Sequence, residues 1–209
     1  MNKSVVLTIM AVCLVANVQA NLLLNGGFED GDLGNLDSVT VDNWITWGSS
    51  GWHHNDAGYM YETKGIKLWW DSTGVYQDFD AVAGVEYTAS LSGISNATDA
   101  LNGWDCVVKI EWLDASYANL ATNEIGRFYG AKDDKGISGD TLDEWKVITG
   151  SSVAVEGAVY GRLVFYLSQA DNWESSTGGS VYLDNAIAIP EPATMALLAL
   201  GGLLLRKRK

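Results

Sequence analysis

Short runs of alternating apolar and polar residues fill the chain between residues 21 and 189, and no apolar period of 3.6 residues is sustained there. Alternation with a period of two is typical of strands that have one buried face. Gly, Asn, Asp and Ser separate the runs, and both prolines of the chain lie beyond them. The pattern predicts strands at Gly65–Trp70, Gly74–Phe79, Glu86–Ser92, Cys106–Leu113, Trp145–Val155, Gly161–Ser168 and Ser180–Ile189.

Many short strands joined by glycine-rich turns favour an all-β fold in which two antiparallel sheets pack face to face. We find no long internal repeat and no linker within residues 21–189, so this segment is expected to form one domain. Its 169 residues are enough for a single sizeable core.

The alternation also assigns side chains to faces, because successive side chains of a strand point in opposite directions. In the run at 65–70, Ile66, Leu68 and Trp70 share the apolar face, so we assign them to the core and Trp69 to the outside. The predicted inward residues of the other runs are Val75, Phe79, Val108, Ile110, Trp112, Leu163, Phe165 and Leu167. The predicted outward residues are Tyr76, Asp78, Lys109, Glu111, Arg162, Val164 and Tyr166.

The first 20 residues have a different pattern. Met1–Ala20 begins with a cation at Lys3, continues as an apolar run and ends in small residues. This order predicts a secretory signal peptide, and the run is shorter than the ~20 residues that a spanning helix needs. Cleavage after Ala20 would remove Cys13 and leave Cys106 alone, so no intrachain disulfide is expected.

The opposite end has three parts in a fixed order. Pro190, Glu191 and Pro192 are followed by an apolar run at 193–205 and by the basic cluster 206–209. A helix over this run would span ~20 Å, which is less than a hydrocarbon core of ~30 Å. We therefore expect a marginal transmembrane helix in the segment 190–209, with its cations on the cytoplasmic side.

This order resembles the PEP-CTERM sorting signal of exported bacterial proteins. The resemblance implies transient insertion in the inner membrane, recognition of Pro190, Glu191 and Pro192 by an exosortase, and removal of the tail. It also implies a final place at the cell surface or in an extracellular polysaccharide matrix.

Charge excludes one class of partner. The chain has 26 acidic and 13 basic residues and a formal net charge of −13. Five of the bases lie near the ends, which leaves residues 21–189 with 25 acidic and 8 basic residues and therefore strongly acidic. Nucleic-acid binding depends on Lys and Arg that displace counterions, so we expect no nucleic-acid partner. Hydrophobic residues make up 47% of the chain, which is enough for a folded core.

Four short motifs carry a second resemblance, and they lie at 21–29, 74–79, 83–88 and 180–185. In this order they resemble the galactose-binding-like jelly roll, the fold of many carbohydrate-binding modules attached to xylanases and glucanases. The resemblance implies a structural Ca²⁺ ion bound by an early Glu and a late Asp, here Glu29 and Asp184. Oxygen ligands suit Ca²⁺, and the ion would join the first strand to the last. The alternative is that both acids are simply solvated.

The sequence gives little support to catalysis. The only histidines, His53 and His54, are adjacent and point apart on an extended chain, so we expect a surface loop rather than a catalytic dyad. No nucleophile elbow, zinc-binding helix or phosphate-binding loop occurs. A pair of carboxylates for glycoside hydrolysis remains an alternative, but 26 acids make such a pair easy to obtain by chance.

The aromatic residues are the better clue, since the chain has 9 Trp and 9 Tyr. Their rings offer rigid apolar platforms with a polar rim, which suit the C–H faces of sugars. We expect Trp69 and Tyr76 to form one platform and Arg162 and Tyr166 a second outward pair. Trp52 and Trp173 lie in polar loops and are further candidates. The tryptophans assigned to the core are Trp44, Trp70, Trp112 and Trp145.

These observations predict an exported, non-catalytic carbohydrate-binding protein of the cell surface or the exopolysaccharide matrix. One alternative is a structural matrix protein that binds no sugar, because exposed aromatic patches also mark protein interfaces. A glycoside hydrolase is the other.

Overall fold

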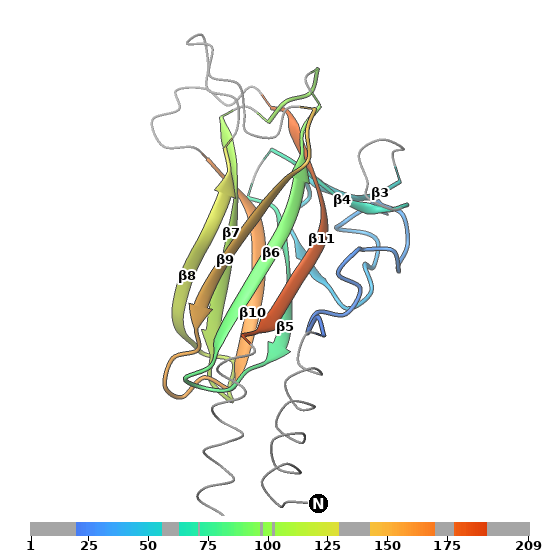
Figure 1. The fold of residues 1–209 in the computed structure, drawn as a ribbon. Helices are drawn as coiled ribbons and strands as arrows, with labels where there is room; N and C mark the ends of the chain where they lie inside the picture. The colour runs from blue at the N-terminus through green and yellow to red at the C-terminus, as the bar shows by residue number, and fades with distance from the viewer. Residues whose placement is uncertain are drawn as a thin grey trace, which may run out of the picture.

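A computed structural model describes residues 20–55, 63–70, 72–96, 98–101, 103–129, 143–169 and 178–191. The described part consists of strands and turns, without a helix (Figure 1). The strands are β1 (Gly34–Asn35), β2 (Ile45–Trp47), β3 (Gly51–His54), β4 (Gly65–Trp69), β5 (Gly74–Asp80), β6 (Glu86–Ile94), β7 (Trp104–Leu113), β8 (Asn119–Phe128), β9 (Lys146–Val153), β10 (Tyr160–Gln169) and β11 (Ser180–Pro190).

The strands form two sheets that pack face to face. One sheet has six strands in the order β1-β3-β4-β11-β6-β9, and the other has five in the order β2-β5-β10-β7-β8. Neighbouring strands are antiparallel in both sheets. The predicted antiparallel β-sandwich is therefore confirmed.

The seven predicted strands match β4 to β7 and β9 to β11 with small shifts at their ends. Four strands were missed, and β8 is the longest of them. This strand lies at the edge of the five-stranded sheet, where neither of its faces is fully covered. Polar residues consequently occur on both faces of β8, and no alternation marks it in the sequence.

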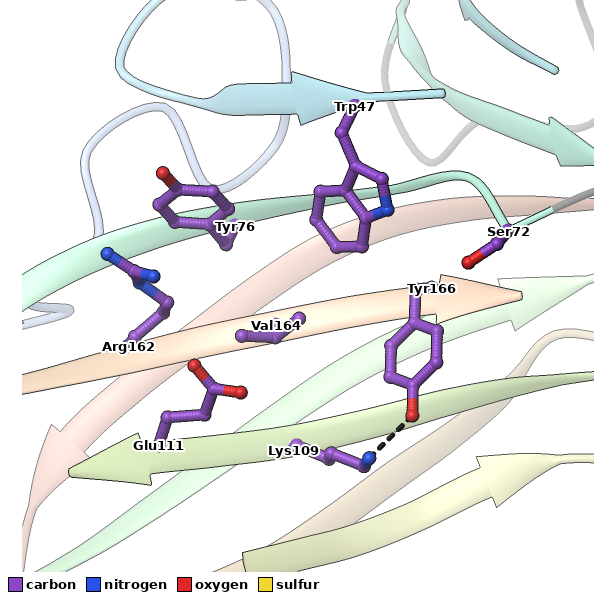
Figure 2. Close-up of a pocket in the computed structure, with 8 residues that line it drawn as sticks. All are labelled: Trp47, Ser72, Tyr76, Lys109, Glu111, Arg162, Val164 and Tyr166. Atoms are coloured by element: carbon purple, nitrogen blue, oxygen red, sulfur yellow. Dashed lines mark hydrogen bonds between the residues drawn. The ribbon is translucent and has the colours of Figure 1, made fainter. Parts of the chain in front are cut away.

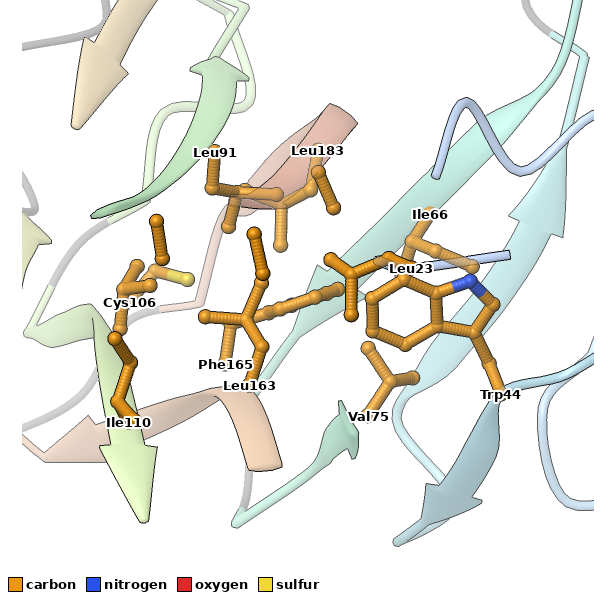
Figure 3. Close-up of a cluster of buried hydrophobic side chains, with 14 of the residues drawn as sticks. Leu23, Trp44, Ile66, Val75, Leu91, Cys106, Ile110, Leu163, Phe165 and Leu183 are labelled. Carbon is orange, nitrogen blue, oxygen red and sulfur yellow. The ribbon is translucent and has the colours of Figure 1, made fainter. Parts of the chain in front are cut away.

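The core lies between the sheets (Figure 3). Ile66, Leu91 and Leu183 from the six-stranded sheet meet Ile110 and Phe165 from the five-stranded sheet. Each of these side chains is completely buried, and burial of such a side chain contributes ~1.5–3 kcal/mol. All the residues predicted to point inward from β5, β7 and β10 are buried, as is the free thiol of Cys106, whose pKa is raised by that burial.

Two of the four tryptophans assigned to the core behave differently. Trp44 and Trp112 are buried as predicted, but Trp70 is 56% exposed. Strand β4 ends at Trp69, and Trp70 has a φ of 39°, so its side chain leaves the alternation and lies against Gly178. Trp145 precedes β9 and is half-buried, because it packs in a small cluster outside the main core.

The two ends of the described chain attach to the six-stranded sheet. Leu22 N donates a 2.8 Å hydrogen bond to Ala188 O of β11, and Ala186 N donates one of 2.8 Å to Gly26 O. Strand β11 extends to Pro190, one residue beyond the predicted limit of the domain, and Glu191 N donates to Glu86 O at 2.8 Å. The predicted signal peptide, Trp173, Pro192 and the predicted C-terminal helix lie outside the described residues. None of the described residues forms a helix that could cross a membrane.

Candidate functional site

The structure divides the predicted binding residues between the two sheets. Tyr76, Arg162 and Tyr166 lie together on the outer face of the five-stranded sheet, and Trp52 and Trp69 belong to the six-stranded sheet. The predicted shared platform of Trp69 and Tyr76 is therefore wrong. Strands β4 and β5 are consecutive in the chain, but the connection between them crosses from one sheet to the other.

A shallow groove of about 320 Å³ runs over the outer face of β5, β10 and β7 (Figure 2). We call it the platform groove. Val164 lies at its centre, with Tyr76 and Arg162 at one end and Tyr166 and Lys109 at the other. The lining residues are Trp47, Ser72, Tyr76, Lys109, Glu111, Arg162, Val164 and Tyr166.

Strand register brings these residues together. Val164 of β10 is paired with Tyr76 of β5 and with Lys109 of β7, so all three side chains lie in one row on the same face. Arg162 is paired with Glu111 in the next row. The outward assignments made from alternation are confirmed for these residues, although the larger side chains around Val164 leave it only 7% exposed.

Trp47 completes the groove and was not among the predicted binding residues. Its strand β2 has only three residues and pairs with the start of β5, where Trp47 lies opposite Gly74. A Cβ atom at Gly74 would lie 2.5 Å from Cζ2 and Cη2 of Trp47 and 2.5 Å from Cβ of Tyr166. The indole ring can therefore lie over the sheet only because position 74 has no side chain. No alternation in the sequence could have identified β2, because the strand has only three residues.

Three aromatic rings line the groove at similar spacing. The ring centroids of Trp47 and Tyr76 are 6.1 Å apart with 44° between the ring planes, and those of Trp47 and Tyr166 are 6.3 Å apart with 42°. Each ring belongs to a different strand of the sheet. The rings form a nearly continuous apolar wall that is fixed by the backbone register.

Arg162 is held rigidly between two neighbours. Its Nε and NH2 atoms donate to the two carboxylate oxygens of Asp78 at 2.6 and 3.0 Å, and its Cζ atom lies 3.9 Å from the ring centroid of Tyr76. The hydrogen bonds to Asp78 raise the pKa of Arg162. A bidentate pair of this kind fixes the guanidinium plane, and the remaining N–H groups can act as donors.

The opposite end of the groove has a second fixed cation. Lys109 Nζ donates a short hydrogen bond to the Tyr166 hydroxyl and lies 4.8 Å from the centroid of that ring. Glu111 adds a carboxylate between the two cations. The platform groove therefore combines apolar ring faces with donors and acceptors whose positions are already set.

The aromatic residues of the six-stranded sheet have a different arrangement. Trp52 is edge-on to Trp69 at 6.1 Å and stacks on His54 at 5.6 Å. Lys67 Nζ lies 5.0 Å from the ring centroid of Tyr182 and 3.3 Å from Asp99 Oδ2. These side chains pack mainly on one another, although Trp52 is 42% exposed.

The two histidines do not form a surface loop. They belong to strand β3, and their side chains lie on opposite faces. His53 is 1% exposed, and its ring nitrogens lie 2.8 Å from Asp32 O and 2.6 Å from Phe28 O. His53 therefore fixes the N-terminal segment to the sheet and has no catalytic geometry.

The predicted metal ligands lie near one another. A Cβ atom at Gly27 would lie 3.9 Å from Asp184 Oδ1 and 3.9 Å from Glu29 Cγ. Glu29 accepts hydrogen bonds from the backbone of Thr63 and Lys64, both at 3.0 Å, and from the Thr63 hydroxyl. Partial burial raises the pKa of Glu29, but these hydrogen bonds outweigh it and leave that pKa lowered.

This oxygen-only donor set, drawn from the first segment and the last strand, fits the chemistry of Ca²⁺. Among the described residues, no group of three or more His, Cys, Asp or Glu side chains is arranged for a metal ion. Any ion at this position would consequently depend on backbone carbonyl oxygens for its other ligands.

Comparison with known sequences identifies one motif. Residues 188–209 match the PEP-CTERM protein-sorting motif. The match confirms that the C-terminal tail resembles this sorting signal. The match begins two residues before Pro190, within strand β11. None of the curated proteins matches the sequence.

The fold is similar to that of several solved structures. TmCBM61, solved in complex with β-1,4-galactotriose, has a TM-score of 0.52 and 18% identity over 82% of this chain and 99% of that chain. The enzymatically active domain of bacteriophage CBA120 tailspike protein 4 has a TM-score of 0.54 and 15% identity over 82% of this chain and 21% of that chain. The CBM22-1–GH10 modules of Clostridium thermocellum endo-1,4-β-D-xylanase 10B, complexed with xylohexaose, have a TM-score of 0.50 and 16% identity. The match covers 77% of this chain and 28% of that chain.

The chain thus spans about a fifth of the tailspike chain and little more than a quarter of the xylanase chain. At these identities the likeness shows the fold, which is the jelly-roll β-sandwich of carbohydrate-binding modules.

Proposed function

We propose that this chain is an exported, non-catalytic carbohydrate-binding protein that holds a glycan in the platform groove. The observation that carries the proposal is the wall of three rings, Trp47, Tyr76 and Tyr166, on three adjacent strands of one sheet. Support also comes from the sugar complexes of similar folds, TmCBM61 with β-1,4-galactotriose and the xylanase modules with xylohexaose.

Binding would rest on two kinds of contact. Sugar rings present flat C–H faces, which pack on the apolar faces of Trp and Tyr. The hydroxyl groups at the ring edges would pair with Arg162, Lys109 and Glu111, which line the same groove. Because Asp78 and Tyr166 already fix the two cations, little side-chain entropy is lost when the sugar binds.

The sorting motif supports the cellular part of the proposal. The expected signal peptide at 1–20 would export the chain, and an exosortase would recognise Pro190, Glu191 and Pro192 while the tail is inserted in the inner membrane. The folded domain, bounded by 21–189 in our assignment, would then reach the cell surface or the exopolysaccharide matrix. The acidic charge of this domain disfavours nucleic acid as the partner.

Affinity electrophoresis of the full chain in mild detergent, through gels that contain different polysaccharides, tests this function. We expect at least one neutral polysaccharide to retard the wild-type protein. Retardation should be lost in Trp47→Ala and kept in Trp52→Ala, the matched change on the opposite sheet. Absence of retardation by every polymer, together with self-assembly that grows with protein concentration, would favour the structural matrix protein instead.

The matrix alternative has a specific observation in its favour. Trp52 and Trp70 are 42% and 56% exposed on the six-stranded side, and exposed aromatic residues also serve protein contacts.

The hydrolase alternative predicts release of reducing sugar. Glu111 is the carboxylate that lines the platform groove, and Asp78 beside it is paired with Arg162, so Glu111 is the residue to replace in that assay.

We further propose a structural Ca²⁺ ion between Glu29 and Asp184. The support is their shared position beside Gly27, which links the N-terminal segment to β11. If the ion is present, a chelator should lower the melting temperature and added Ca²⁺ should restore it. Glu29→Gln should weaken this response, and Glu156→Gln, a change at an exposed turn, should leave it intact. A melting temperature that does not change when chelator is added would contradict the proposed Ca²⁺ ion.

A further inference from the structure

A second groove of about 480 Å³ borders the platform groove along the outer edge of β5. We call it the edge groove. Tyr76 lines both grooves, and Asp78, which lines the edge groove, holds the Arg162 side chain of the platform groove. The two grooves therefore form one continuous surface around Tyr76.

The edge groove exists because β2 is short. Its three residues pair with Gly74–Tyr76, and no strand of the described chain pairs with the same edge of β5 beyond that point. The N-terminal segment forms the other wall and is fixed by Gln77, whose side chain bonds Leu24 N at 2.6 Å and Leu24 O at 2.8 Å. Leu24 and Ile45 leave an exposed apolar rim on this wall, at 62% and 55%.

A stacked pair of tyrosines ends the edge groove. The rings of Tyr117 and Tyr160 are nearly parallel, with centroids 4.6 Å apart and 5° between their planes. Tyr117 has a φ of 63°, which is unfavourable for a bulky residue. Asp114 holds this turn, because its Oδ1 atom accepts hydrogen bonds from Ser116 N at 2.8 Å and Ala118 N at 2.9 Å.

Strain of this kind persists only where the surroundings enforce it, and here it holds a ring that is 53% exposed against its neighbour. The tyrosine pair is thus a rigid platform at the far end of β5. Tyr160 is paired with Asp80, and Trp47 is paired with Gly74 at the other end of the same strand. These six steps along β5 span ~20 Å, at ~3.3 Å for each residue.

The charge of the edge groove differs from that of the platform groove. Asp78 and Asp80 line it, and none of its lining residues in the described chain is Lys or Arg. The contact with Tyr160 raises the pKa of Tyr117, and the charges of Asp78 and Asp80 act in the same direction. A carboxylate on a ligand would be repelled here chiefly by Asp80, because Arg162 offsets the charge of Asp78 and like charges in a partly desolvated groove cost free energy.

We infer that the edge groove continues the platform groove as a second binding region for the same glycan, so that the protein binds an internal stretch of a linear, uncharged polysaccharide and selects against uronic acids. This inference rests on the proposed function of the platform groove. It assigns Tyr117 and Tyr160 to the far end of the bound chain and Asp80 to the rejection of anionic sugars.

Titration of the full chain with β-1,4-linked galactose oligomers and xylose oligomers of increasing length tests the inference. In the wild type, affinity should rise roughly tenfold once the oligomers reach the tyrosine pair, which corresponds to ~1.4 kcal/mol. Tyr117→Gly keeps the backbone of the turn, because glycine accepts a positive φ, and it should abolish this rise without changing the affinity for short oligomers. Tyr129→Gly removes an exposed tyrosine that lines neither groove, so its affinities should equal those of the wild type.

The charge selection is measured with the same galactose oligomers oxidised to uronates at C6. The wild type should bind the oxidised oligomers several-fold more weakly than the neutral ones, and Asp80→Asn should reduce that difference. The inference would be overturned if affinity still rose with oligomer length in Tyr117→Gly, or if the wild type bound neutral and oxidised oligomers equally well. Either result would leave the proposed function of the platform groove standing. If no oligomer of any length binds the wild type, the proposed function fails, and the inference fails with it.

Discussion

On the five-stranded sheet, Trp47, Tyr76 and Tyr166 surround an open groove, whereas on the six-stranded sheet Trp52 and Trp69 pack edge to face on each other. Both outer faces carry Trp, Tyr and a lysine. Lys109 stands at the end of its groove, and Lys67 lies over Tyr182 and pairs with Asp99. The difference shows that aromatic content does not make a binding face, because contacts among the rings decide whether their faces stay available to a ligand.

A single glycine accounts for much of this difference. Gly74 leaves space for the indole of Trp47 to lie across the strand beside Tyr166. The six-stranded sheet has a comparable glycine at Gly93, but there the space is filled from the core by Phe128, 2.8 Å from the position of a Cβ atom. The same substitution should therefore affect binding on one sheet and only stability on the other.

The largest expected effect is loss of binding when the wall of the platform groove is removed. Trp47→Ala should weaken glycan binding roughly 30-fold, which corresponds to the ~2 kcal/mol typical of a central aromatic anchor. Trp69→Ala should leave affinity within a factor of two, since Trp69 belongs to the six-stranded sheet. Calorimetric titration of both variants measures the contrast. Equal losses in the two variants would mean that both faces bind, and the comparison would fail.

An intermediate effect is expected from the two glycines. Gly74→Ala should displace Trp47 and weaken binding about tenfold, with a loss of ~1–3 kcal/mol in the free energy of unfolding from overpacking. Gly93→Ala should cost a similar unfolding free energy and leave affinity unchanged. Urea unfolding and glycan titration of the two variants separate these effects. Unaltered binding in Gly74→Ala would show that the position of Trp47 does not matter.

The smallest effect concerns acid groups on the two sheets. Hydrogen bonds from Arg127 lower the pKa of Glu124 on β8, and those from Lys146 lower the pKa of the fully exposed Glu144 beside β9. A lowered folded-state pKa stabilises the protein above the unfolded pKa of about 4.3, and this contribution disappears as the pH falls through the folded value.

Glu124→Gln should therefore reduce the unfolding free energy by ~0.5 kcal/mol at pH 7, after allowance for solvent screening, and by nothing measurable at pH 2. Glu144→Gln should change neither value, because its pair with Lys146 is open to solvent. Thermal unfolding at the two pH values is the measurement. A loss in Glu124→Gln that is equal at pH 7 and pH 2 would contradict the assigned role of its charge.

Local periodicity was sufficient to predict the strands that are buried on one face. Along β10, Leu163, Phe165 and Leu167 alternate with Arg162 and Tyr166, and each side chain lies on the predicted face. The signal is strong there because every second residue is excluded from water by the opposite sheet. Most of the core and six of the eight residues that line the platform groove followed from this rule.

The rest of the site depends on contacts that the sequence does not encode locally. Strand pairing places β5 beside β2 and β10, in the sheet opposite its chain neighbour β4, and this separates Tyr76 from Trp69. Trp47 was missed because three residues are too few to show a period. The exposed position of Trp70 depends on the end of β4 and on a positive φ, which alternation cannot predict.

The most direct measurement is the NMR spectrum of the indole N–H groups while a binding glycan is added to the full chain. The account predicts that the Trp47 indole signal shifts with the glycan concentration and that the signals of Trp52 and Trp69 stay in place. Shifts of the Trp52 and Trp69 signals while that of Trp47 remains fixed would contradict it.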